Sequence, residues 1–154
     1  MTPPTEPRPP GSSSADGPQA EALLKIRNLL AQDQPGLAYL VYQRAQRETP
    51  DWQLPVQELV KTISGLAQLH DAEKAVPLMR EYLQRYPERS ARMRLMLAQV
   101  LVRDATRPAQ ALAVIAKIDP GTLAEELVET RKKIELEAHL KLAIGVVEPA
   151  PEDW

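Results

Sequence analysis

The stretch HDAEKAVPLMREYLQRYPER, residues 70–89, decides the fold of this chain. Its apolar residues recur three and four positions apart, which is the spacing of one face of an α-helix. Pro77 interrupts the stretch, but the apolar face continues on both sides of it. With Asp71 as N-cap, Pro77 lies just past the first turn and removes one backbone hydrogen bond. The stretch therefore predicts a single helix, mildly bent at Pro77.

Related segments lie on both sides of this stretch, about 36 residues apart. Pro50, Pro87 and Pro120 each follow a helix-like run, where a residue that interrupts helices is expected. Three units result, residues 19–50, 54–87 and 89–120, and each contains two helix-length runs joined by a tight polar turn. Repeats of this length are typical of stacked helical hairpins.

A further run, residues 122–144, has an apolar stripe opposite its charges. The members of the stripe are Leu123, Leu127, Ile134 and Ala138. The third unit holds two runs, residues 95–102 and 111–118, that are apolar on nearly every side and so need cover on every side. Residues 122–144 are therefore expected to form a capping helix over the third unit.

Composition supports the same fold class. The chain has 154 residues, which suits one domain, and it is 44% hydrophobic but only 4% aromatic, with no phenylalanine. A core of Leu, Ala, Val, Ile and Met favours helix packing, so we expect an all-α domain over residues 19–144. The Pro- and Ser-rich residues 1–18 predict a disordered tail, and residues 145–154 an acidic one.

The composition also narrows the setting of the protein. There is no cysteine, the first residues do not resemble a signal peptide, and no apolar run is long enough to span a bilayer. We expect a cytoplasmic protein without membrane insertion, and the sequence leaves its oligomeric state open.

The three units resemble tetratricopeptide repeats. The residues that carry the resemblance are Ala38, Tyr42, Ala45 and Pro50, then Ala75, Met79, Tyr82 and Pro87, then Leu97, Ala98, Leu101 and Ala111. The resemblance implies a right-handed array of about three antiparallel helical hairpins, a solenoid, with a C-terminal capping helix. The units depart from the family pattern where Ile26 and Ile63 replace a small residue. The last two units also resemble soluble helical extensions of some bacterial rhomboid-type membrane proteins.

In the family, the first helix of each unit lines a concave groove that binds peptides. By that resemblance, the candidate groove residues are Arg27, Lys61, Ser64, Gln68, Arg92, Gln99 and Arg103. The family's polar clamp for chaperone carboxyl termini is not reproduced, since Leu23 and Val60 stand at two of its positions.

No motif in the sequence predicts catalysis. The two histidines, His70 and His139, belong to no motif with the spacing of a metal or catalytic site, and His70 is expected at a helix end with its side chain on free carbonyls. There is no phosphate-binding glycine loop and no nucleophile motif. We therefore expect a non-enzyme with no catalytic residue, no metal site and no cofactor.

The charges are unevenly distributed along the chain. The region from Arg80 to Arg107 contains seven arginines and three acidic residues, whereas from Pro108 onward there are nine acidic and five basic residues. These are either solvated helix faces or an arginine-lined site for carboxylates or phosphates. Nucleic acid is disfavoured because aromatic side chains do not alternate with the arginines.

The sequence thus predicts a protein-interaction or scaffolding module whose partner is a peptide or an acidic protein surface. The alternative is an accessory protein that binds a polyanion or nucleic acid through the region from Arg80 to Arg107. Trp52 is expected to pack across the junction of the first two units. For Trp154, which follows two acidic residues, a short linear interaction motif is a further hypothesis.

Overall fold

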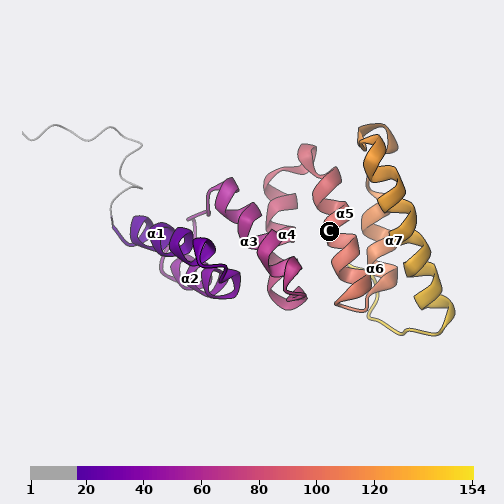
Figure 1. Cartoon of the computed structure of the whole chain (residues 1–154), viewed down its shortest axis with the longest axis horizontal. Helices are drawn as coiled ribbons and strands as arrows, with labels where there is room; N and C mark the ends of the chain where they lie inside the picture. Colours follow the sequence, from indigo (N-terminus) through magenta and orange to yellow (C-terminus); the bar gives the residue numbers. More distant parts are fainter. Residues whose placement is uncertain (1–16) are drawn as a thin grey trace, which may run out of the picture. The chain divides into compact units, whose positions relative to one another are not determined.

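The computed structural model describes residues 17–154, and these form seven α-helices, two short 3₁₀ turns and no strand. The helices are α1 (Pro18–Ala31), α2 (Pro35–Glu48), α3 (Val56–Gln68), α4 (Ala72–Arg85), α5 (Ala91–Arg103), α6 (Pro108–Ala116) and α7 (Glu125–Ala143). The all-α prediction is confirmed for this part of the chain (Figure 1). Residues 1–16, where most of the predicted disordered tail falls, lie outside the described residues. None of the seven helices is long and apolar enough to cross a bilayer.

The chain divides into two compact units, and the division falls inside α3 between Gly65 and Leu66. Unit 1 contains α1, α2 and most of α3. Unit 2 contains the end of α3, helices α4 to α7 and the residues that follow them.

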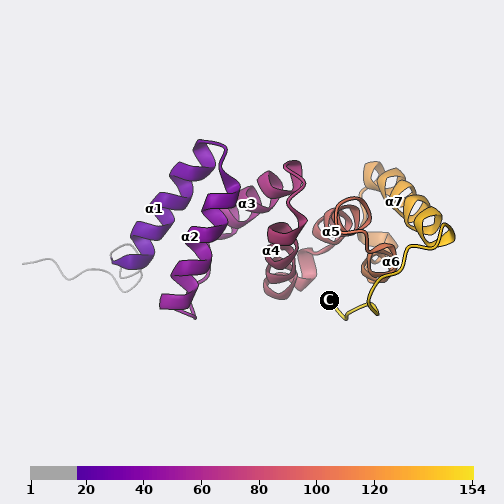
Figure 2. The ribbon, with the colours of Figure 1, turned by 90° about the horizontal axis from the view of Figure 1, so that it is seen from below.

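In unit 1, α1 and α2 pack on each other as a helical hairpin (Figure 2). Ile26 of α1 and Ala38 of α2 are fully buried, and Tyr42 is 1% exposed. The Tyr42 hydroxyl accepts a hydrogen bond from the backbone N–H of Leu54 at 3.2 Å. The ring of Trp52 packs edge-on against Tyr42, with 5.5 Å between centroids. These contacts hold the connection between α2 and α3 against the hairpin.

The same turn geometry recurs at three places in the chain. Asp33, His70 and Thr106 all adopt left-handed backbone conformations, with φ of 58°, 57° and 53°. Each precedes the N-cap residue of a helix, and in the first two turns that residue donates to a carbonyl five positions back (Gln34 to Leu29, Asp71 to Leu66). This is the Schellman arrangement, which satisfies carbonyls at a helix end. The three residues are 37 and 36 positions apart, which is close to the spacing predicted for the repeat.

Helix α4 runs without interruption through Pro77, as predicted. Asp71 is its N-cap, and the Asp71 carboxylate accepts a hydrogen bond from the backbone N–H of Lys74. Proline at this depth leaves one carbonyl of the preceding turn without its helical partner. The mild bend at Pro77 stays a prediction.

In unit 2, α5 contacts α4, α6 and α7, and α7 also packs on α6 (Figures 1 and 2). Seven of the thirteen residues of α5 are buried. Ile134 and Ala138 of α7 are buried as well, so the prediction that this run covers the third unit is confirmed. The helix begins at Glu125, because a 3₁₀ turn, η3 (Pro120–Thr122), occupies the expected start.

Candidate peptide-binding surface

Basic side chains of unit 2 gather on one surface. Arg80 comes from α4, Arg94 from α5, Arg107 from the loop before α6, and Lys117 from the end of α6. The contacts of α5 with α4 and α6 bring these residues, far apart in sequence, into reach of one bound segment.

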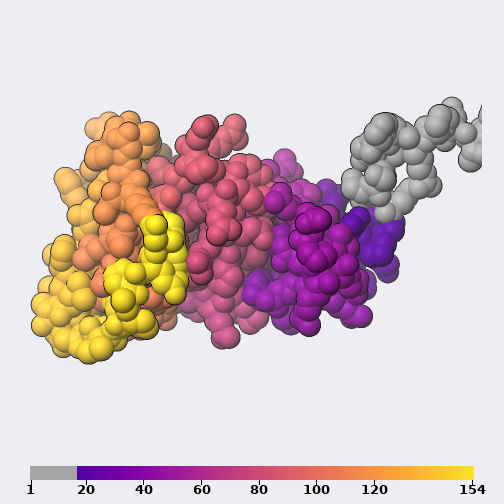
Figure 3. All heavy atoms as spheres, turned by 180° about the vertical axis from the view of Figure 1, so that it is seen from behind, coloured from indigo at the N-terminus to yellow at the C-terminus, as the bar shows by residue number. Residues whose placement is uncertain are grey.

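That segment is residues 148–154 of the chain itself, EPAPEDW, called here the acidic segment. Helix α7 ends at Ala143, and Gly145 follows with φ of 90°, a conformation that glycine adopts without strain. The acidic segment has neither helix nor strand structure. Figure 3 shows its atoms, in yellow, lying on the outside of unit 2 against the orange and rose atoms of the helices.

Glu148 caps the N-terminus of α6. Its two carboxylate oxygens accept hydrogen bonds from the backbone N–H groups of Ala109 at 2.8 Å and Gln110 at 2.9 Å. The residue at the N-cap position, Arg107, makes no side-chain cap of its own. A carboxylate at this end satisfies free donors and meets the positive end of the helix dipole, which contributes about 1 kcal/mol.

Gln110 binds the backbone of the acidic segment. Its side chain is fully buried, and its amide N–H donates to the Glu152 carbonyl at 2.8 Å. Its amide oxygen accepts from the Glu152 N–H. The backbone N–H and C=O of Glu152 are thus both paired with the Gln110 side chain. This pairing fixes the register of the segment and does not depend on which side chain residue 152 carries.

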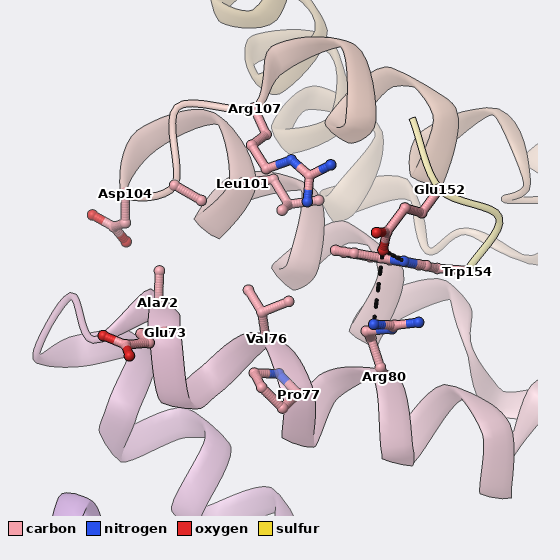
Figure 4. A pocket seen from close by; sticks show the side chains of 11 residues that line it. Ala72, Glu73, Val76, Pro77, Arg80, Leu101, Asp104, Arg107, Glu152 and Trp154 are labelled. Atoms are coloured by element: carbon pink, nitrogen blue, oxygen red, sulfur yellow. Dashed lines mark hydrogen bonds and ion pairs between the residues drawn. The ribbon is translucent and has the colours of Figure 1, made fainter. Parts of the chain in front are cut away.

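Trp154 anchors the far end of the segment. Its ring lies against the guanidinium groups of Arg80 and Arg107, 4.6 and 5.6 Å from the ring centre (Figure 4). Each cation–π contact of this kind contributes about 0.5–2 kcal/mol. The indole N–H donates to Glu152 at 2.6 Å. The Trp154 carbonyl oxygen accepts from Arg94 at 3.1 Å and Lys117 at 2.7 Å.

The acidic side chains of the segment pair with the same basic residues. Asp153 forms an ion pair with Lys117, and Glu152 lies 3.8 Å from Arg80. The hydrogen bond from Lys117, followed by its positive charge, holds the pKa of Asp153 below its ordinary value of 3.8. The ion pair therefore favours the ionised form of Asp153.

A hollow of about 470 Å³ lies beside Trp154. Its apolar lining comes from Ala72, Val76, Pro77, Leu101, Ala105 and the Trp154 ring, and its charged rim from Glu73, Arg80, Asp104, Arg107 and Glu152 (Figure 4). Within residues 17–154, the Nε atom of Arg107 is the one buried side-chain nitrogen or oxygen without a hydrogen-bond partner. An unpaired buried donor costs about 1–3 kcal/mol, so an acceptor placed at Arg107 would stabilise a bound ligand.

His70 lies near this hollow but differs from the prediction. It sits at the end of α3, as expected, but its Nδ1 is 2.9 Å from the Asp104 carboxylate, so the expectation that its ring binds free carbonyls is wrong. The carbonyls are instead satisfied by the backbone bonds of the Schellman turn.

The predicted groove residues lie elsewhere. Arg27 pairs with the buried Glu58 at 2.9 Å, and Arg103 lies 3.7 Å from Glu137. The other five, Lys61, Ser64, Gln68, Arg92 and Gln99, form no ion pair or hydrogen bond through their side chains among the described residues. None of the seven forms an ion pair or a hydrogen bond with the acidic segment among the described residues, and because the set draws on both units, the groove that they were expected to line stays a prediction.

The arginine-rich region from Arg80 to Arg107 contributes directly to this surface. Three of its seven arginines, Arg80, Arg94 and Arg107, contact the acidic segment. The residues that sequence reasoning did not single out are Gln110, Lys117, Glu148 and Glu152. The signal for them is the adjacent excess of opposite charge, together with a tryptophan placed directly after two acids.

Among residues 17–154, no three His, Asp or Glu side chains are grouped so as to hold a metal ion. Comparison with protein-family models, with curated proteins and with solved structures gives no match to this chain.

Proposed function

We propose that this protein is a non-catalytic protein-interaction module, built from helical repeats of the tetratricopeptide kind, and that unit 2 binds an acidic peptide or acidic protein surface. The observation that carries the proposal is the acidic segment, which lies extended on the basic surface with its backbone paired to Gln110. The surface already has the contacts that an external acidic peptide would use.

The chemistry of these contacts suits peptide recognition. Side-chain amides that pair with a peptide backbone supply affinity and register, whereas charges and an aromatic anchor supply selectivity. Arg80, Arg94 and Lys117 supply charge, and the Arg80 and Arg107 guanidinium groups receive the aromatic ring.

Binding of a polyanion through the region from Arg80 to Arg107 has less support. The buried amide of Gln110 matches a peptide N–H and C=O on one residue, and a phosphate chain offers no donor to its oxygen. A polyanion would also compete with the peptide for the same arginines, which makes the alternative testable.

The proposal is tested with the full chain carrying Trp154→Ala, which weakens the hold of its own segment. The probe is the fluorescein-labelled peptide Glu-Pro-Ala-Pro-Glu-Asp-Trp with both ends blocked, and fluorescence anisotropy measures its binding. We expect saturable binding that falls at least tenfold on adding Gln110→Leu, which removes two hydrogen bonds. Gln57→Leu is the control, because Gln57 is an exposed residue of α3 in unit 1, and it should leave the affinity unchanged.

Two results would contradict the proposal. One is the absence of saturable binding to the Trp154→Ala chain, and the other is equal binding of a peptide in which Lys replaces both Glu residues and the Asp. Competition by inorganic polyphosphate with a steep salt dependence, together with indifference to Gln110→Leu, would favour the polyanion alternative.

A further inference from the structure

We propose that the acidic segment is an internal competitor for the binding surface, and that the external partner is another protein's extended acidic stretch with an aromatic residue directly after its acids. This inference rests on the proposed function and adds to it the chemistry of the partner and the way in which binding is regulated.

The acidic segment is attached to unit 2 without belonging to its core. None of residues 145–154 is buried, whereas the core residues of α5, α6 and α7 pack against one another independently of the segment. The segment is held by hydrogen bonds, ion pairs and two ring–guanidinium contacts at partly exposed positions. Contacts of this kind can be exchanged for the same contacts from another chain while the helices stay folded.

The fit of the segment to the surface is incomplete. The hollow beside Trp154 holds no side chain of the segment other than the Trp154 ring and Glu152 at its edge. The Arg107 Nε donor, at the same place, has no acceptor. A partner that fills the apolar floor and places a carboxylate or carbonyl oxygen at Arg107 gains interactions that the segment does not make.

The short connection gives the segment an advantage over a free peptide. Only four residues separate the end of α7 at Ala143 from Glu148. A tether of this length gives an effective concentration in the millimolar range, so an untethered peptide with identical contacts competes poorly at micromolar concentration. A partner therefore binds either because it makes the additional contacts or because the segment has been released.

The test compares the wild-type chain with the Trp154→Ala chain, using the same blocked, labelled heptapeptide. We expect the dissociation constant of the heptapeptide to be at least tenfold lower for Trp154→Ala than for wild type. The substitution weakens the binding of the tethered segment and leaves the surface intact. Glu152→Pro, which removes the N–H that binds Gln110, should act in the same direction. Val147→Ala is the matched control, since Val147 is 92% exposed next to the segment, and it should behave as wild type.

The chemistry of the partner is tested by varying the peptide on the Trp154→Ala chain. Replacing the peptide's Trp by Ala, or its three acids by Gln, Gln and Asn, should each weaken binding at least tenfold. Equal affinity for all three peptides would overturn the stated chemistry of the partner.

The remaining outcomes separate the two proposals. If wild type and Trp154→Ala bind the heptapeptide equally, the segment is not a competitor, although the proposed function stands. If neither binds it, both proposals fall. If sedimentation shows a wild-type dimer that Trp154→Ala separates into monomers, the segment is exchanged between two copies, and competition within one chain is overturned.

Discussion

The two tryptophans of this chain both follow an aspartate, yet they lie in opposite environments. Trp52, in unit 1, packs edge-on against the buried Tyr42 between α2 and α3. Trp154, in unit 2, lies against the guanidinium groups of Arg80 and Arg107 on the surface. The first ring has an aromatic neighbour and the second has two cationic ones, although both rings are half-buried.

The comparison shows how the same dipeptide serves two purposes. Trp52 packs on Tyr42, which is buried, and a buried ring stabilises the fold and is costly to remove. A ring against two arginines on a surface contributes less and can dissociate. Because each unit has one tryptophan, fluorescence of Trp154→Phe and Trp52→Phe chains reports on the two units separately.

The largest effect should come from removing the ring that Trp52 packs against. Tyr42→Ala removes a buried ring, its contact with Trp52 and its hydrogen bond with Leu54, and should cost about 3–5 kcal/mol of unfolding free energy in unit 1. Thermal unfolding followed by Trp52 emission in a Trp154→Phe chain measures the loss. Tyr42→Phe, which keeps the ring, should cost only about 1 kcal/mol. A similar cost for the two substitutions would show that the hydroxyl, and not the ring packing, holds Trp52.

The all-α structure was predictable because its signals are local, whereas the right-handed array of hairpins stays a prediction. Helix periodicity, proline placement and the Asp71 cap depend on residues within one or two turns, and the all-α structure, the uninterrupted α4 and the cover supplied by α7 are confirmed. The need for that cover could be deduced because α5 is apolar on nearly every side. The start of α7 was placed three residues early, since the Asp119 side chain accepts a hydrogen bond from Gly121 and favours a 3₁₀ turn there.

The candidate site was predictable only as a charge pattern. The excess of arginine from Arg80 to Arg107 and the acidic residues after it are visible in the sequence, and complementary charges attract. The cap that Glu148 places on α6 joins residues 38 and 39 positions apart, and no local pattern predicts it. The role of Gln110 could not be predicted for the same reason, because its side chain binds a backbone carbonyl 42 residues away.

A smaller effect should come from a substitution in unit 2, the unit that contains Trp154. Thr106, directly before Arg107, adopts φ of 53°, which is costly for a β-branched residue, so Thr106→Gly should stabilise unit 2 by about 1 kcal/mol. Amide hydrogen exchange in α5 and α6 measures the gain, because Trp154 emission also changes when the segment alone dissociates.

Asp33→Gly is the matched control, since it changes the same turn position in unit 1. It should shift only the transition reported by Trp52, and by less, because aspartate tolerates this conformation better than threonine does. Destabilisation by Thr106→Gly would mean that the threonine side chain makes interactions that outweigh its backbone strain.

The smallest effect concerns pH, which should act on Trp154 and not on Trp52. Lys117 lowers the pKa of Asp153 when the segment is bound, so the stabilisation of the bound segment is present above the ordinary value of 3.8 and is lost as pH falls through the lowered pKa. As pH is lowered from neutral to below 3.8, Trp154 emission in a Trp52→Phe chain should shift toward that of a solvated indole, whereas Trp52 in a Trp154→Phe chain should change only if unit 1 unfolds. Asp153→Asn should remove part of the pH dependence and leave the neutral-pH emission almost unchanged, because the ion pair is exposed. A Trp154 signal that is flat over this range, with the helices intact by circular dichroism, would show that the segment is held by its backbone and ring contacts alone.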